Sequence, residues 1–364
     1  MTQTSEPLLK VEHLKVAYPI RSAILQRRTG ENVAVSKVNF ELSPGQTVGL
    51  VGESGSGKSS VARTVIGLVR PSDGRVIFQG QDITNYSPRQ LKDVRRQMQM
   101  IFQDPYASLN PRYTIEQIIA EGWRVHPGAV SRKQWQAEVK DLLDRVGLNP
   151  DYSNRYPHQF SGGQRQRLGI ARALAVSPDL IVCDEPVSAL DVSIQAQVVN
   201  LLKDLQARLG LSYLFIAHDL AVVKHIADRV AVMYLGRLVE IADKRTLFAA
   251  PRHPYTQALL SAIPKPDPAL ARSRILLPGD VPSPLAPPSG CRFHTRCTYA
   301  QAKCSQETPA LRPAGAGHQV ACHFFEQVEV PRELTSLAGS GITGKFAERL
   351  ALFEAAKHRE PHPA

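Results

Sequence analysis

A glycine-rich turn that ends in lysine and serine is the clearest chemical signal in the sequence. Residues 52–59 read GESGSGKS and match the pattern G-x-x-x-x-G-K-[ST]. Glycines let backbone N–H groups face inward around phosphate oxygens, and a helix that begins at the turn adds its positive dipole end. We expect Lys58 to reach the β- and γ-phosphates of a nucleotide and Ser59 to bind Mg²⁺. The predicted nucleotide-binding residues are Gly52, Glu53, Ser54, Gly55, Ser56, Gly57, Lys58, Ser59 and Ser60.

Two carboxylates at the end of an apolar run form a second candidate group. Residues 180–185 read LIVCDE. A strand end beside the phosphate loop is where a second Mg²⁺ ligand is needed, and Asp184 fits that place. Glu185, one residue further, is expected to polarise the attacking water as a general base. An acidic surface turn would have the same letters, but its pairing with the phosphate loop favours nucleotide hydrolysis.

These side chains need a scaffold, and short apolar runs that alternate with helical patterns predict one. Such alternation is typical of a mainly parallel sheet in an α/β fold. The stretch 104–175 changes to helical apolar spacing and is interpreted as an inserted helical region, whereas the basic stretch 19–32 is predicted to be a loop. The expected strands are 8–17, 33–41, 47–51, 76–79, 180–182 and 213–217, and the expected helices include 59–69 and 194–209.

Length, charge and composition limit the class of protein. The chain has 364 residues, a formal net charge of +11 and 43% hydrophobic residues, which suits one large α/β domain plus an appendage. No apolar run approaches the roughly 18–20 residues that span a bilayer. The start MTQTSE lacks the features of a secretory signal, so a cytosolic chain with reduced thiols is expected. The charge favours an acidic partner, which leaves nucleotide, anionic lipid headgroups and nucleic acid open.

The run FSGGQRQR at residues 160–167 resembles the signature sequence of ABC-type ATPases, with Phe160 where Leu is commoner. This resemblance implies a P-loop ABC-type ATPase domain with a mixed sheet core and a helical subdomain. It implies ATP and Mg²⁺ as cofactors. It also implies that each ATP is shared by two chains, because the signature contacts the ATP held by the partner subunit. The signature residues are Ser161, Gly162, Gly163 and Gln164.

Other motifs of the same family follow in order over about residues 8–250. Gln103 resembles the Q-loop glutamine that contacts Mg²⁺ and water, and His218 resembles the histidine that contacts the γ-phosphate. Tyr18 resembles the aromatic residue that stacks on adenine. The run at 188–191 resembles the D-loop that crosses the dimer interface, with Ser188, Ala189, Leu190 and Asp191.

A finer resemblance links the chain to the ATPases of oligopeptide and dipeptide importers, and within them to the F-type subunit. The stretches 193–202, 215–226 and 253–259 and the cysteine-rich region after them carry it. It implies a second ABC ATPase subunit as partner (in a hetero-dimer, with a homodimer as the alternative), two transmembrane permease subunits, and a substrate-binding protein that acts through them. It also implies a peripheral position on the cytoplasmic side of the cell membrane, with no nucleic acid bound. A nickel, opine or glutathione importer, a soluble ABC-type ATPase acting on nucleic acid or ribosomes, and a redox or metal sensor remain alternatives.

Residues 261–290 are interpreted as a Pro-rich linker between an ATPase domain at 1–260 and a small cysteine-rich region at 291–330. Four thiolates that converge can hold Zn²⁺ or an iron–sulfur cluster, but the short cysteine pairs of a zinc ribbon are missing. The family resemblance implies a [4Fe–4S] cluster. The proposed ligands are Cys291, Cys297, Cys304 and Cys322, whereas Cys183 is expected only to pack. A tail at 331–364 is predicted to carry a short amphipathic helix at 345–357.

Overall fold

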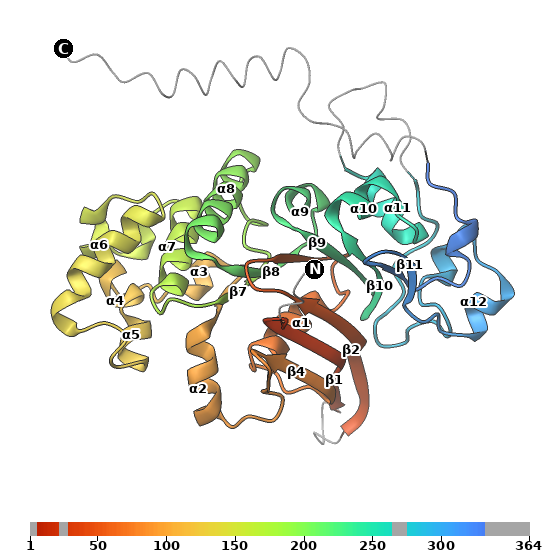
Figure 1. Cartoon of the computed structure of the whole chain (residues 1–364), viewed down its shortest axis with the longest axis horizontal. Coiled ribbons are helices and arrows are strands. Elements are labelled where there is room, and N and C mark those ends of the chain that lie inside the picture. Colours follow the sequence, from red (N-terminus) through yellow and green to blue (C-terminus); the bar gives the residue numbers. More distant parts are fainter. Residues whose placement is uncertain (1–5, 22–27, 264–274, 332–364) are drawn as a thin grey trace, which may run out of the picture.

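Two β-sheets and a set of helices make up the fold of the computed structural model, which describes residues 6–21, 28–263 and 275–331. Within these residues, the larger sheet has the strand order β11-β12-β10-β9-β3-β8-β7-β6 and the smaller one the order β2-β1-β4-β5. Figure 1 shows helices on one side of the larger sheet and the smaller sheet, with further helices, on the other. The mixed-sheet α/β fold predicted from the sequence is confirmed.

The larger sheet has a parallel centre that is buried on both sides. Successive side chains of a strand face opposite ways, so Ile181 and Cys183 join one hydrophobic cluster while Leu180 and Val182 join the other. Continuous apolar runs such as residues 180–183 suit a sheet covered on both faces. The parallel strands are β3 (Thr47–Val51), β6 (Met98–Ile101), β7 (Leu180–Asp184), β8 (Ser212–Ala217) and β9 (Arg229–Tyr234).

Helices pack on both sides of the parallel strands. The helices α8 (Val192–Leu209) and α9 (Leu220–Ile226) lie on one side of the sheet, and α1 (Lys58–Val65) lies on the other, facing the smaller sheet (Figure 1). The helix α2 (Pro88–Gln97), opened by a capping box at Ser87, leads into the edge strand β6. The predicted helix at 59–69 is confirmed but ends earlier, at Val65.

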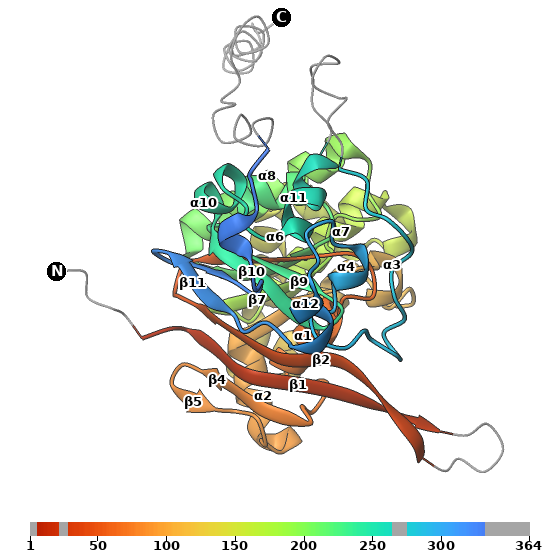
Figure 2. The same ribbon diagram turned by 90° about the vertical axis from the view of Figure 1, so that its right-hand side faces the viewer.

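The smaller sheet is antiparallel and corrects the interpretation of residues 19–32 as a loop. Its strands are β1 (Leu9–Arg21), β2 (Arg28–Leu42), β4 (Asp73–Phe78) and β5 (Gln81–Asp82). Strands β1 and β2 pair from Leu9 opposite Leu42 to Arg21 opposite Arg28. The basic residues at both strand ends hid this long hairpin, because charged and proline residues are poor strand formers that cross-strand pairing can override. Figure 2 shows the hairpin projecting beyond the rest of the fold.

The stretch 104–175 is helical, as the sequence predicted, and lies at one end of the molecule (Figure 1). Its core holds Trp123, whose side chain is 2% exposed and whose indole N–H donates to the Ala175 carbonyl. Its helices are α3 (Pro105–Ser108), α4 (Ile115–Ile119), α5 (Glu121–Val125), α6 (Trp135–Arg145) and α7 (Gly162–Leu174), with 3-10 turns η1 (Arg132–Gln134), η2 (Pro150–Asn154) and η3 (Pro157–Gln159).

The cysteine-rich region is not an appendage separate from the predicted ATPase domain. Its strands β11 (Arg312–Gly315) and β12 (His318–Val320) extend the larger sheet, where β12 pairs with β10 (Arg237–Asp243). Its remaining elements are α12 (Ala302–Gln306), η5 (His294–Arg296) and η6 (Phe325–Gln327), and it is preceded by α10 (Lys244–Ala249) and α11 (Pro254–Ser261). The blue ribbon at the opposite end from the helical region in Figure 1 is this part of the chain.

Two further predictions fall partly or wholly outside the residues that the structure describes. Residues 275–290 of the predicted Pro-rich linker contain no helix or strand, while residues 264–274 and the predicted tail helix at 345–357 lie outside the described residues. None of the helices in the described ranges combines the length and hydropathy that crossing a bilayer requires.

Candidate nucleotide site

The loop at residues 52–57 connects strand β3 to helix α1, as the motif requires. A Cβ atom at Gly57 would lie 2.3 Å from the Ala34 carbonyl oxygen, and one at Gly52 would lie 2.2 Å from the Met233 carbonyl oxygen. Both residues have positive φ, 100° and 153°. Only glycine fits these two places, so the loop can keep its N–H groups turned toward an anion at the start of α1.

Lys58 lies beneath this loop with its side chain almost fully buried. Its Nζ donates hydrogen bonds to the carbonyl oxygens of Gly52 at 2.7 Å and Glu53 at 2.9 Å. Burial lowers the pKa of Lys58, and the carboxylates of Glu185, Asp184 and Glu53 oppose that shift. The loop thus holds the ammonium in place before any phosphate arrives.

A hydroxyl and a carboxylate from two elements meet beside the lysine. The Ser59 Oγ donates to the Asp184 Oδ1 at 2.9 Å. Burial raises the pKa of Asp184, although the Ser59 hydrogen bond and Arg63 act in the opposite direction. A nearby cation would remove the cost of the buried charge, and oxygen ligands of this kind are those that Mg²⁺ prefers. The two side chains therefore fit a magnesium site.

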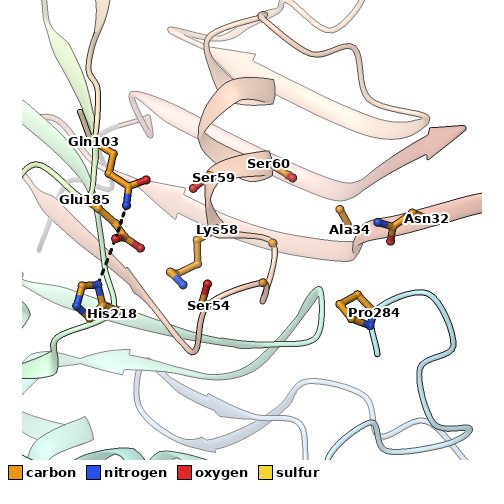
Figure 3. Close-up of a pocket in the computed structure, with 12 residues that line it drawn as sticks. Asn32, Ala34, Ser54, Lys58, Ser59, Ser60, Gln103, Glu185, His218 and Pro284 are labelled. Atoms are coloured by element: carbon orange, nitrogen blue, oxygen red, sulfur yellow. Dashed lines mark hydrogen bonds and ion pairs between the residues drawn. The ribbon is translucent and has the colours of Figure 1, made fainter. Parts of the chain in front are cut away.

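Gln103, Glu185 and His218 form a hydrogen-bonded group across the cavity from Lys58 (Figure 3). The Glu185 Oε2 accepts from the Gln103 Nε2 at 3.1 Å and lies 3.2 Å from the His218 Nδ1. Glu185 itself has a positive φ of 47°, and its N–H donates to the Ile216 carbonyl. A glutamate held in a rarely populated conformation is a strained residue of the kind found at functional sites.

The parallel sheet explains why residues far apart in sequence meet here. Strands β3, β8, β7 and β6 are neighbours, and the phosphate loop, His218, Asp184 with Glu185, and Gln103 lie at or just beyond their carboxyl ends. Ligands of open α/β sheets bind outside these ends. Lys58, Ser59, Gln103, Glu185 and His218 are among the residues that line a cavity of about 580 Å³, and Asp184 is joined to it through its hydrogen bond with Ser59.

The other end of the cavity holds residues that the sequence did not indicate. Asn32, Ala34 and Pro284 line it, from strand β2 and from the Pro-rich segment (Figure 3). Tyr18, predicted to stack on adenine, is not among the residues that line the cavity. Its hydroxyl donates instead to the Oγ of Ser60, a lining residue, at 3.3 Å.

The signature residues lie at the start of helix α7, outside this cavity. Ser161 caps the helix, since its Oγ accepts from the Gln164 N–H and the Gln164 Oε1 accepts from the Ser161 N–H. Of the cavity-lining residues, none comes from positions 161–164. A Cβ at Gly163 would lie 2.5 Å from the Ile194 Cγ2, whereas at Gly162 the nearest atom, Leu190 Cδ2, is 3.5 Å away.

The predicted D-loop, residues 188–191, lies between strand β7 and helix α8. Ser188 Oγ donates to the Glu185 carbonyl at 3.0 Å, and Ala189 and Leu190 follow. Asp191 is the residue before α8 but makes no side-chain capping bond. The loop therefore joins Glu185 to the surface that carries the signature.

The four cysteines do not form a site for a single metal ion. Among the described residues, which include all four, no group of three or more His, Cys, Asp or Glu side chains is placed to hold a metal ion. The thiols are close enough to influence one another: burial, with a contribution from other cysteines, raises the pKa of Cys297 to about 12 and of Cys322 to about 11. The geometry gives no support to the zinc or iron–sulfur prediction.

Residues from the C-terminal third also contact the phosphate loop, a relationship that the sequence did not reveal. The Arg296 Nη1 lies 3.0 Å from the Glu53 Oε2, and the Glu53 N–H donates to the Tyr255 hydroxyl at 2.9 Å. Arg296 and Glu53 are 243 positions apart, so no local pattern could have indicated the pair.

Comparisons with known proteins agree with this geometry. The family described as ABC transporter matches residues 35–188, and the family described as oligopeptide/dipeptide transporter, C-terminal region, matches residues 239–304. The oligopeptide transport ATP-binding protein AppF of Bacillus subtilis is 52% identical, over 88% of this chain and 98% of that protein.

Two solved structures are similar to the fold. One is cbiO1 of Clostridium perfringens, part of the ABC transporter complex cbiONQ, with a TM-score of 0.59 and 26% identity, covering 68% of this chain and 92% of that one. The other is the dimeric post-hydrolysis state of the ATP-binding cassette MJ0796 bound to ADP and Pi, with a TM-score of 0.58 and 26% identity, covering 65% and 98%.

Proposed function

The chain belongs to the ABC transporter family of ATP-binding proteins, and we propose that it powers a binding-protein-dependent importer of oligopeptides or dipeptides by hydrolysing ATP. The observation that carries this proposal is the cavity at the carboxyl ends of four parallel strands. There a buried lysine, a Ser59–Asp184 pair and the group of Gln103, Glu185 and His218 face one another. Each is suited to a different part of phosphoryl transfer.

We assign the following roles to these side chains. Lys58 and the loop N–H groups bind the β- and γ-phosphates, while Ser59, Asp184 and Gln103 hold Mg²⁺, which neutralises phosphate charge when bound. Glu185 accepts the proton of the attacking water, and His218 and Gln103 orient its carboxylate through the hydrogen bonds already present. We propose that the adenine base lies at the end of the cavity that Asn32, Ala34 and Pro284 line, and that Tyr18, whose hydroxyl donates to the lining residue Ser60, stacks on it.

The position of the signature supports a site shared by two chains. Since Ser161 and its neighbours do not line the cavity of their own chain, we propose that they cover the ATP of a second ATPase subunit. N–H groups at the start of α7 are suited to bind a γ-phosphate. The similar cassette MJ0796 has been solved as a dimer. We propose that the partner here is a different subunit, so that the dimer is heteromeric.

A groove between the sheet and the helical region supports a permease as the membrane partner. It has a volume of about 340 Å³, and the apolar side chains of Leu68, Phe102 and Val125 are exposed at it. Phe102 lines the groove and the next residue, Gln103, lines the nucleotide cavity. A permease segment that moves Phe102 would therefore also move the adjacent Gln103, which contacts Glu185. We place the chain peripherally on the cytoplasmic face of the membrane, bound to two permease subunits.

The cargo is proposed from relatives. The similar protein AppF is named for oligopeptide transport, and the C-terminal family match is to a region of oligopeptide and dipeptide transporters. The substrate-binding protein and the permease subunits would select the peptide. The residues of the nucleotide cavity are proposed to bind and hydrolyse ATP, whichever solute the assembly transports.

A further part of the proposal concerns the four cysteines. We propose a [4Fe–4S] cluster on the four cysteines, supported by the family match that includes Cys291, Cys297 and Cys304. A four-iron cluster binds each cysteine to a different iron, so its sulfurs stand further apart than around one ion. Iron and acid-labile sulfide analysis of anaerobically purified chain tests this. An iron-free chain with four alkylated thiols would contradict it.

The transport proposal is tested by reconstitution. The chain, a second ATPase, two permeases and the binding protein are placed in vesicles, and uptake of labelled peptide and ATP hydrolysis are measured together. We expect peptide-loaded binding protein to stimulate both, and Lys58→Ala in this chain to abolish uptake. Uptake that ignores peptide but follows nickel or another solute would contradict the cargo. ATPase activity stimulated by nucleic acid instead would contradict the transporter.

A further inference from the structure

One residue of the phosphate loop is held by the C-terminal third of the chain. Glu53 follows the first glycine of the loop, and its carboxylate contacts the Arg296 Nη1 at 3.0 Å and 3.3 Å through its two oxygens. The Arg296 side chain is only 9% exposed and that of Glu53 is 28% exposed. The pair is therefore partly removed from water, where an ion pair is screened less than at the surface.

The backbone of the same residue is held on both sides. The Glu53 N–H donates to the Tyr255 hydroxyl at 2.9 Å, and the Glu53 carbonyl accepts from the Lys58 Nζ at 2.9 Å. Arg296 therefore acts on the residue whose carbonyl helps to place the phosphate-binding lysine. Arg296 itself does not line the nucleotide cavity.

Arg296 is placed by a rigid part of the cysteine-rich region. Arg296 is the last residue of the 3-10 turn η5. The turn begins directly after Phe293, which is 1% exposed. The Phe293 ring packs against the rings of Tyr234 at 5.2 Å and Tyr255 at 5.4 Å between centroids. Aromatic rings at such distances make a stable core, so the guanidinium is fixed before nucleotide binds.

The charges give the pair a direct consequence for ATP. Glu53 lies in a loop that receives a polyanion, and an unpaired carboxylate there would repel it. Burial of Arg296 favours its neutral form, but Tyr234 and Glu53 together act in the opposite direction and the pKa of Arg296 is raised. The guanidinium therefore stays charged and neutralises the carboxylate beside the phosphates.

We propose that Arg296 is a positioning residue for ATP binding: through its ion pair with Glu53, the cysteine-rich region neutralises and orients the phosphate loop. This deepens the proposed function and rests on it, because it adds a residue to the same nucleotide site. The cysteine-rich region thereby becomes a part of the site, although it lies more than 200 positions after the loop in sequence.

The test measures Mg-ATP affinity of the full chain and the KM and kcat of the assembled ATPase. Arg296→Gln should weaken affinity and raise KM by about threefold to tenfold, as loss of a partly buried charged pair predicts, with kcat changed less than twofold. Arg296→Lys should restore part of the affinity because it keeps the charge. Adding Glu53→Gln to Arg296→Gln should also restore affinity, since it removes the unpaired carboxylate.

Arg312→Gln is the matched control. Arg312 lies in the same region and pairs with Glu326 at 3.6 Å, far in sequence from the loop. We expect it to leave ATP affinity unchanged. An equal loss of affinity in both variants, additive effects of the Arg296 and Glu53 changes, or an Arg296→Gln chain with normal affinity would each overturn the proposal.

Two measurements keep the result interpretable. Thermal melting checks that each variant is folded. If Arg296→Gln fails to fold, the Arg296→Lys chain alone decides. We then expect a smaller loss of ATP affinity, and unchanged affinity would overturn the proposal. Lys58→Ala serves as a chain that loses ATP binding in any case. If the unaltered chain bound no ATP, the proposed function itself would be wrong, which is a different outcome from a silent Arg296 change.

Discussion

The Ser59 hydroxyl donates a 2.9 Å hydrogen bond to the Asp184 carboxylate across 125 positions of sequence, which joins the start of helix α1 to the end of strand β7. Asp184 is buried as well, and burial raises its pKa. Ionised Asp184 therefore lowers the free energy of unfolding of the chain, whereas the same charge would help to bind Mg²⁺.

The first prediction follows from this conflict. Asp184→Asn should stabilise the nucleotide-free chain at neutral pH, because a raised pKa means that ionised Asp184 costs folding free energy. The gain should be absent at pH values below the pKa of the unfolded carboxyl, about 3.8, and should grow as pH rises through the folded pKa. Denaturant midpoints at several pH values measure it.

The same variant should need more magnesium for hydrolysis. The concentration for half-maximal ATPase activity should rise by on the order of tenfold or more, since loss of outer-shell partners alone costs that much. The control is Asp228→Asn. The Asp228 carboxylate accepts from the Thr47 N–H, and Asp228 does not line the cavity. A destabilised Asp184→Asn chain with normal magnesium dependence would contradict both statements.

The second prediction concerns the general base. Glu185→Gln should keep ATP binding and reduce turnover by on the order of 10² or more. Binding persists because Lys58 and the loop are untouched, whereas Lys58→Ala should lose both. Single-turnover hydrolysis in the assembled transporter is the measurement. Turnover within a few-fold of the unaltered protein would remove Glu185 from this role.

The third prediction uses a glycine that tolerates a side chain. A Cβ at Gly162 meets its nearest atom at 3.5 Å, so Gly162→Ala should be folded and active. Gly162→Asp should place a carboxylate where the partner's ATP is expected and should abolish ATP-dependent pairing of the two ATPase subunits. ATP binding by the isolated chain should be unchanged. Size-exclusion chromatography with and without ATP shows the pairing, and normal pairing of the aspartate variant would contradict a shared site.

The fourth prediction concerns acid stability. Burial lowers the pKa of His253 to about 4 from an ordinary value of 6.5. A depressed pKa stabilises the fold above pH 6.5, and that contribution is lost as pH falls from 6.5 to about 4. His253→Asn should flatten this part of the stability curve while its side chain still caps helix α11, as the His253 Nδ1 does for the Tyr255 N–H.

Urea unfolding between pH 4 and 7 measures the change. The control is His13→Asn, at an exposed position whose positive φ of 49° asparagine tolerates. The control should leave the pH dependence of stability unaltered. An equally steep loss of stability in the His253 variant would show that another group titrates in this range.

The residues of the candidate nucleotide site could be selected from the sequence because their signals are local. The loop at 52–59 needs its strand before it and its helix after it, and both are recorded in adjacent residues. Asp184 was predicted from its place at a strand end. Its partner Ser59 could be inferred only through the shared chemistry, and the structure brings the two together.

Contacts that depend on tertiary pairing were missed. The strand pairing of residues 19–21 with 28–31 opposes their weak strand propensity. Strand β11 reads Arg-Pro-Ala-Gly, which no strand pattern would select, and it forms because β12 offers backbone partners. The ion pair of Arg296 with Glu53 has no sequence signature at all.

Strand β12 also decides what happens to the edge of the larger sheet. It pairs with β10 at Glu240–Val320 and Ile241–Gln319, so the middle of the outer edge of β10 is covered. The outermost strand is instead β11, which is short and contains a proline, the kind of edge that resists pairing with a foreign chain. A chain cut before residue 312 would expose β10 as a template for aggregation. The cysteine-rich region thus protects the chain against aggregation. A chain shortened to its nucleotide-binding part would lose this protection.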